Sequence, residues 1–261
     1  MIVSFLPILP HPVTQYNTVY TALKNFQNVL RQLTQNHLAV TCDEGVYRIA
    51  REIILWRPAE FKDLTLCLGS FHLLKIYLGC IGKYLRGSGA ESIWIENEIF
   101  GPNTSQAVLA GSHYARSLEG MVLLSEAMER LQWSAFFEKL GVKKYVEPLK
   151  LLKEMKQEVT VKNNLRSKEL LNSFLGLSGD LFKDFKEAEN KTFFYWHRFI
   201  EMVRLAKDLV RADREGNWHL HLQSVEAILP YFAAFDSINY LRWCSLYLED
   251  MKKLPDCTYH P

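Results

Sequence analysis

Two adjacent acidic residues, Asp43 and Glu44, follow a predicted strand and open a predicted helix. A carboxylate at the carboxyl end of a parallel strand is where Mg²⁺-dependent phosphoryl-transfer sites place a metal ligand. The same pair also fits a structural interpretation, because Asp43 can cap the helix and Glu44 can complement the helix dipole. The motif by itself favours the helix cap. A metal site also needs a second carboxylate, and the end of the next predicted strand offers only Ser70 and His72, which weakens the case for an enzyme.

The predicted late helices carry two further acidic candidates. Glu226 lies within a predicted helix over 219–233, and Asp236 follows that helix. Either carboxylate would complete a catalytic set if the fold brought it close to Asp43. A structural interpretation is also open, in which a buried Asp236 contacts Asn239 or Arg242 and joins the last two helices. The apolar surroundings favour this packing role.

A lysine-rich stretch between residues 142 and 191 is the main local concentration of positive charge. Its candidate nucleic-acid ligands are Lys143, Lys144, Lys150 and Lys153, whose ammonium groups could neutralise phosphates. Few aromatic residues that would stack on bases accompany them, so a solvated helix face explains the charge at least as well. The chain as a whole has 31 basic and 29 acidic residues, so any binding to nucleic acid must come from a local patch.

The composition argues against several protein classes. The five cysteines are widely spaced, which fits reduced thiols in an intracellular protein, either nuclear or cytoplasmic. The longest apolar stretch, 64–82, carries His72 and Lys75, so we expect no membrane span and no membrane partner. We find no Walker loop, no nucleophile elbow and no dinucleotide fingerprint. The N-terminus is a poor signal peptide, and its immediate strand-like start suggests a piece of a longer ancestral protein.

Alternating strand and helix patterns predict the fold that would position these residues. Strands are expected over 2–9, 38–42 and 64–68, and helices over 16–33, from Asp43 to before Pro58, and over 71–85. This order is typical of a small parallel sheet covered by helices. Beyond Gly89 the pattern is helical, with long segments over 112–140 and 192–213 and two final helices over 219–233 and 237–253.

Several segments together carry a resemblance to a known group of proteins. They are Cys42–Tyr47, Gly69–Leu74, Tyr77–Gly82 with Gly87–Gly89, Gly101–Thr104 and Phe235–Trp243. Over about residues 2–256 the chain resembles animal proteins that descend from transposable elements, which are related to transposases with a ribonuclease-H-like core. The resemblance implies a helical insertion between an early carboxylate, Asp43 here, and a last one on a late helix, Glu226 or Asp236. No earlier strand with its own acid precedes Asp43, and Ser70 stands where an acid is wanted, which implies a truncated or inactive remnant.

Together these patterns predict a predominantly helical α/β protein with about three parallel strands in its first third. We expect an α/β core over 1–100, a helical insertion with the basic segment over 101–191, and C-terminal helices over 192–261. The predicted function is that of a transposon-derived, non-catalytic protein that binds DNA, another nucleic acid or a protein partner, without a cofactor. One alternative is an active nuclease or transposase with Mg²⁺ held by Asp43 and Glu226. The other is a purely structural helical module.

Overall fold

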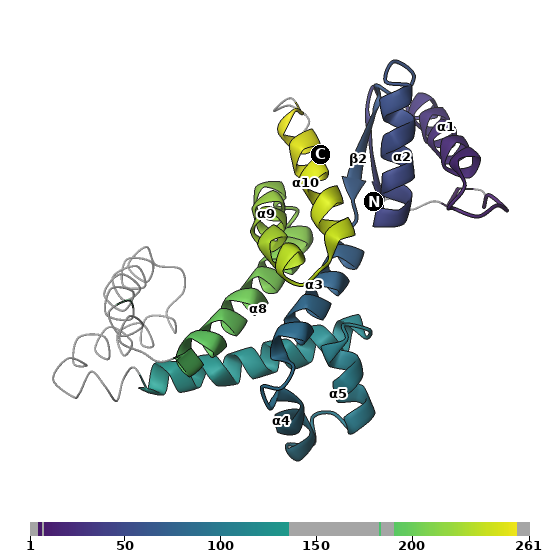
Figure 1. Cartoon of the computed structure of the whole chain (residues 1–261). Helices are drawn as coiled ribbons and strands as arrows, with labels where there is room; N and C mark the ends of the chain where they lie inside the picture. The colour runs from purple at the N-terminus through teal and green to yellow at the C-terminus, as the bar shows by residue number, and fades with distance from the viewer. Residues whose placement is uncertain (1–4, 7, 136–182, 184–190, 255–261) are drawn as a thin grey trace, which may run out of the picture. The chain divides into compact units, whose positions relative to one another are not determined.

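The computed structural model describes residues 5–6, 8–135, 183 and 191–254 (Figure 1). The chain divides into two compact units. One is formed by residues 1–117 together with 205–261, and the other by residues 118–204. None of the described helices is both long enough and apolar enough to cross a membrane.

The N-terminal part of the first unit contains two strands that alternate with helices. The elements are α1 (Tyr16–Gln32), β1 (Leu38–Cys42), α2 (Glu44–Trp56), β2 (Leu64–Leu68) and α3 (Ser70–Leu85). The strands pair in parallel, in a register that runs from Leu38 opposite Leu64 to Cys42 opposite Leu68. The fold is therefore predominantly helical with a small parallel sheet, which confirms the coarse prediction.

The described sheet has two strands, where about three were predicted. Of the expected first strand over 2–9, the described residues 5, 6, 8 and 9 have no regular secondary structure. Phe5 is 95% exposed and Ile8 is 92% exposed. Pro7 and Pro10 explain the difference, because a proline has no amide hydrogen to donate to a strand ladder.

The two faces of the sheet have different surroundings. Val40 and Leu66 point toward α1 and α2, where they line a small cavity together with Leu23 and Ala50. The alternate positions point to the other face, because successive side chains of a strand alternate. These positions are Ala39 and Thr41, which are exposed, and Thr65 and Cys67, which are half-buried.

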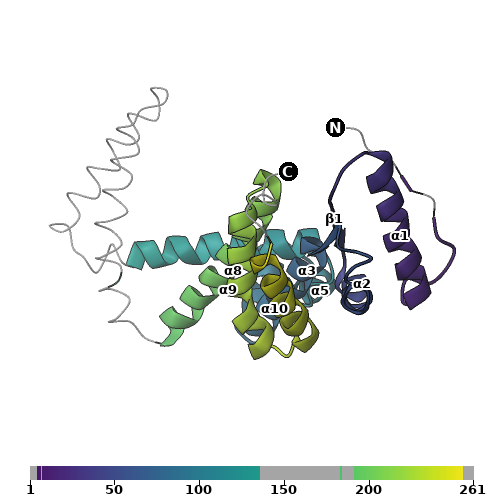
Figure 2. The same ribbon diagram turned by 90° about the horizontal axis from the view of Figure 1, so that it is seen from above.

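The remaining helices of the first unit are α4 (Ala90–Glu96), α5 (Pro102–Leu109), α9 (Trp218–Ala234), α10 (Ile238–Lys252) and the C-terminal part of α8 (Lys191–Glu215). Among them, α5 and α9 contact α3, α10 contacts α2, and α4 contacts α5. Figure 2 shows α9 and α10 side by side. Tyr47 of α2 packs edge-on against Trp243 and Tyr247 of α10, with ring centroids 6.4 and 6.2 Å apart. Arg51 of α2 also donates hydrogen bonds of 2.7 and 3.1 Å to the Asp250 carboxylate of α10.

The second unit contains most of a helix over 114–135 and the first half of α8. His197 of α8 lies 3.2 Å from the amide oxygen of Gln132, and both side chains are buried. Arg204 forms an ion pair with Glu129. These contacts hold the two helical segments against each other within this unit.

Candidate functional site

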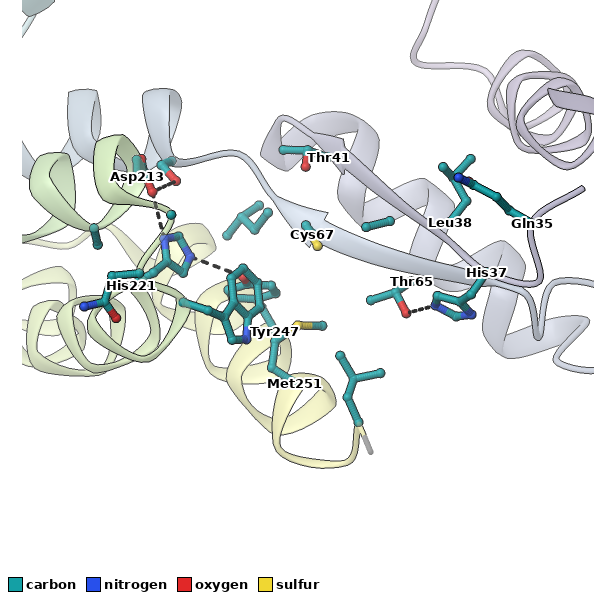
Figure 3. Close-up of a pocket in the computed structure, with 18 residues that line it drawn as sticks. Gln35, His37, Leu38, Thr41, Thr65, Cys67, Asp213, His221, Tyr247 and Met251 are labelled. Carbon is teal, nitrogen blue, oxygen red and sulfur yellow. Dashed lines mark hydrogen bonds and ion pairs between the residues drawn. The ribbon is translucent and has the colours of Figure 1, made fainter. Parts of the chain in front are cut away.

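An open pocket of about 910 Å³ lies on the sheet face that α1 and α2 leave uncovered (Figure 3). Ala39, Thr41, Thr65 and Cys67 form its sheet side. The opposite side comes from the end of α8, the start of α9 and the last turns of α10. We call this cavity the sheet-face pocket. The residues of α8, α9 and α10 that line it are Ala212, Asp213, Trp218, His221, Tyr247 and Met251.

A tight turn between α8 and α9 places the polar side chains of the pocket. Gly216 has a φ of +64°, a left-handed conformation that glycine adopts without steric cost. The Asn217 side chain then accepts a 3.0 Å hydrogen bond from the Leu220 amide and caps α9. Because the chain reverses here, Asp213 of α8 and His221 of α9 face each other.

His221 lies at the centre of a hydrogen-bonded network. Its Nδ1 is 3.0 Å from Asp213 Oδ1, and its Nε2 is 3.2 Å from the Tyr247 hydroxyl. Burial raises the pKa of Tyr247 well above its ordinary value, so the hydroxyl keeps its proton and shares a hydrogen bond with Nε2. The Asp213 carboxylate can only accept a hydrogen bond, so the Nδ1 hydrogen of His221 is donated to it. Ser70 Oγ also donates to Asp213 Oδ1, at 3.2 Å.

This network has the parts of a catalytic triad in an arrangement that does not activate a nucleophile. In a Ser-His-Asp triad the histidine takes a proton from the serine. Here Ser70 contacts the carboxylate, while His221 Nε2 is engaged by Tyr247, whose side chain is fully buried. The Trp218 ring also stacks on the imidazole, with centroids 5.2 Å apart. The network therefore joins α3, α8, α9 and α10 and forms a fixed wall of the pocket.

The structure places Asp43 at the N-terminus of α2, where its Oδ1 accepts a 3.0 Å hydrogen bond from the Val46 amide. Glu226 lies on α9 and pairs with Lys252 at 3.4 Å, with both side chains largely exposed. Asp236 is exposed in the turn before α10, with a φ of +55°. Each of the three predicted carboxylates thus has a different environment.

Helix α10 shows that Asp43 and Glu226 are not brought together. Burial raises the pKa of Tyr240 to about 12, with smaller contributions from the charges of Glu44, Cys244 and Asp43, so Asp43 lies near the first turn of α10. Glu226 instead pairs with Lys252 in the last turn. The twelve positions from Tyr240 to Lys252 correspond to a rise of about 18 Å.

This arrangement does not fit a two-metal centre, in which the ions are about 4 Å apart. Asp236 precedes α10 and therefore lies at the same end of this helix as Asp43, so Glu226 is the carboxylate that lies at the other end. In the part of the chain that the structure describes, no group of three His, Cys, Asp or Glu side chains has the geometry to hold a metal ion.

The cysteines near the sheet are free thiols with little nucleophilic character. Burial raises the pKa of Cys67, which lines the pocket, to about 11, and raises the pKa of Cys42 to about 12, with a further contribution from Asp43. At neutral pH both groups are therefore protonated, and the protonated thiol is a poor nucleophile.

The predicted nucleic-acid ligands Lys143, Lys144, Lys150 and Lys153 lie outside the described residues. The residues that build the pocket were not predicted as a site. A local sequence signal near His221 is the Gly216–Asn217 pair, which is typical of a break between two helices.

A family model described as "Domain of unknown function (DUF8702)" matches residues 2–259, almost the whole chain. No curated protein and no solved structure matches the chain.

Proposed function

Because the chain belongs to the DUF8702 family, whose function is unknown, we propose a function from the geometry of its own residues. The protein is a non-catalytic binding protein, descended from a transposable element, that receives an extended segment of a partner protein in the sheet-face pocket. The two parallel strands, with Asp43 at a strand end and acidic helices late in the chain, support descent from a ribonuclease-H-like core.

The lining of the pocket is the observation that carries the choice of partner. Among the described residues that line it, Asp213 is the one with a fixed charge, and none is a lysine or an arginine. A phosphate backbone would be repelled by this carboxylate and would find no cation. Apolar side chains such as Leu38 and Met251 lie beside hydrogen-bonding groups such as Thr41 and Asn217. This mixture suits the side chains of a peptide.

The strands beside the pocket offer a second means of binding a peptide. In a sheet of two strands, each strand has one edge that its partner leaves unpaired, and β1 is the more exposed strand at Ala39 and Thr41. An extended segment can add to such an edge through main-chain hydrogen bonds, while alternate side chains enter the adjoining pocket. The pocket is open to solvent, so a segment of chain can lie along it.

The environment of Asp43 supports a role without catalysis. Its carboxylate is engaged as a helix cap, and Glu226 lies near the other end of α10. The rival function, a Mg²⁺-dependent nuclease or transposase, requires Asp43 as a metal ligand. It predicts Mg²⁺-dependent cleavage of DNA that is abolished by Asp43→Asn, a substitution that keeps the cap. Absence of cleavage by the unaltered chain supports the non-catalytic role.

A peptide-selection experiment tests the proposed function. Peptides selected from a random library on the full chain should bind with micromolar Kd, and Thr41→Arg should weaken them at least about tenfold by filling the pocket. Gln106→Arg on α5, also an exposed position, is the control and should leave binding unchanged. Failure to select any peptide, or equal binding by Thr41→Arg, would overturn the proposal.

A nucleic-acid partner is a second candidate because of the basic segment in the sequence. It predicts salt-sensitive retention of DNA or RNA that falls when Lys143, Lys144, Lys150 and Lys153 are neutralised. If the chain retains neither peptides nor nucleic acids, the remaining hypothesis is that it is a purely structural helical module.

A further inference from the structure

A second groove, of about 340 Å³, lies between α3 and the segment that follows α5. It shares no lining residue with the sheet-face pocket. Three of its lining residues are basic: Lys75, Lys83 and Arg86. No aspartate or glutamate is among the described residues that line it. We call it the basic groove.

Lys75 and Lys83 lie on α3, and Arg86 is the C-cap residue at the end of this helix. At 100° per residue, Lys83 is rotated by about 80° from Lys75 and Arg86 by about 20°, so the side chains share one face of the helix. Along the axis, Lys75 and Arg86 are separated by about 16 Å. The positive charges therefore form a row, and like charges in a row repel one another unless an anion is bound.

These cations have few partners within the protein. The Lys83 ammonium group donates a 2.6 Å hydrogen bond to the carbonyl oxygen of Phe235. Within the described part of the chain, neither Lys75 nor Arg86 forms an ion pair. Asp236, which precedes the lining residue Ser237, is exposed and is not part of the lining. The charge of the groove is thus not neutralised locally.

Glycines leave the floor of the groove without side chains. Gly111 has a φ of +68°, and a Cβ there would lie 2.8 Å from the amide nitrogen of Gly79. The two backbones are in close contact as a result. Ser112 and Ser237 contribute hydroxyl groups, and Ser237 Oγ shares a 3.5 Å hydrogen bond with Cys80 Sγ. Ammonium, guanidinium and hydroxyl donors around a bare backbone floor suit the acceptor oxygens of a phosphate.

We propose that the basic groove binds the phosphate backbone of a nucleic acid. A row of charge about 16 Å long matches a polymer better than a single phosphate, because each strand of DNA carries a charge about every 3.4 Å along the axis. The exposed positions of Lys83 and Arg86 allow a long ligand to pass over the groove. The basic groove is separate from the sheet-face pocket. Its charged side chains are positive, whereas the charged side chain of the sheet-face pocket, Asp213, is negative.

Fluorescence anisotropy with a labelled single strand and a labelled duplex, each of about 20 nucleotides, tests the proposal on the full chain. Between about 50 and 200 mM salt, the affinity of the unaltered protein should fall steeply. The triple variant Lys75→Gln/Lys83→Gln/Arg86→Gln should bind at least about tenfold more weakly, and its salt slope should fall by about 2 to 3. Lys75→Arg/Lys83→Arg retains the charge and should retain the binding.

A matched control separates the groove from the general charge of the protein. Arg48→Gln/Arg130→Gln/Lys207→Gln removes three exposed cations from elsewhere and should change the affinity little. The single variant Arg86→Gln, at an exposed position, covers the case in which the triple variant does not fold, and it should still weaken binding measurably. Equal losses in the two triple variants, or no loss in either groove variant, would overturn the site.

Inorganic phosphate serves as the competing probe. If the unaltered chain binds inorganic phosphate in a manner that depends on Arg86 but binds neither oligonucleotide, the nucleic-acid ligand is refuted. Because peptide binding is measured with a different probe on a different cavity, failure here leaves the test of the sheet-face pocket intact.

Discussion

The contact between α3 and the end of α5 provides a test that the structure makes quantitative. A Cβ added to Gly82 would lie 1.7 Å from the carbonyl oxygen of Leu109 and 2.5 Å from its carbon. Gly79 lies almost one turn earlier on the same helix. A Cβ there would be 3.5 Å from its nearest neighbour, the carbonyl oxygen of Ala110, which is an ordinary van der Waals distance. The two glycines therefore form a matched pair.

The two Gly→Ala substitutions should differ in their effect on stability. Alanine is favoured over glycine in a helix by up to about 1 kcal/mol, so Gly79→Ala should be neutral or stabilising. At Gly82 the clash is with backbone, which cannot rotate away as a side chain does. The end of α5 must move, and overpacking of this kind costs about 1–3 kcal/mol, occasionally more. We expect Gly82→Ala to lose about 2 kcal/mol or more of unfolding free energy.

Urea unfolding measured by circular dichroism and tryptophan fluorescence would give both changes. The midpoint should shift at an unchanged slope, because a change in midpoint alone reports stability. If Gly82→Ala is as stable as the unaltered chain, or if the two variants shift equally in the same direction, α3 does not approach Leu109 this closely. The floor of the basic groove, which the same two segments build, would then also be incorrect.

Three further perturbations test the site and its supports. In a double-mutant cycle, Tyr247→Phe and His221→Phe should show a coupling of about 1 kcal/mol, whereas additivity within about 0.4 kcal/mol would exclude their hydrogen bond. Burial is the main cause that raises the pKa of Cys42 and of Cys244 from 9.0 to about 12, so the unfolded thiols ionise first as the pH rises. Unfolding free energy should then fall between about pH 9 and 12, by about 1.4 kcal/mol per pH unit for each thiol; urea titrations that show no fall would contradict this burial. Asp43→Ala should cost about 1 kcal/mol in thermal or urea unfolding while Asp43→Asn costs little, and equal losses would exclude the cap.

The elements with strong local signals were predictable from the sequence. β1 and β2 occupy the predicted ranges 38–42 and 64–68, because each is a short apolar run closed by Asp43 or Gly69. Helix α8 covers the predicted 192–213 and extends slightly beyond it, since its apolar stripe has a helical period. The expected first strand was wrong at its described residues. Its apolar residues outweighed Pro7 and Pro10 in the prediction, although the prolines oppose strand pairing.

The pocket itself could not be predicted, because tertiary contacts assemble it. Asp213 and His221 are brought together by the Gly216 turn, but no local pattern indicates that Tyr247, on the next helix, completes the network. Whether Asp43 is a helix cap or a metal ligand also depended on tertiary contacts that the sequence does not show. Its sequence context allows a cap or a metal ligand, and only the positions of α10 and Glu226 show which neighbours it has.

The two cavities have opposite electrostatic character although one helix contributes to both. Ser70, the first residue of α3, donates to Asp213 in the sheet-face pocket, while Lys75, Lys83 and Arg86 line the basic groove farther along. A single site that cleaved nucleic acid would need its carboxylates and its phosphate ligands together, because the metal must bridge the two. Here the carboxylate of the pocket and the cations of the groove line separate cavities. That separation favours a protein that holds two different partners over one that cuts a single substrate.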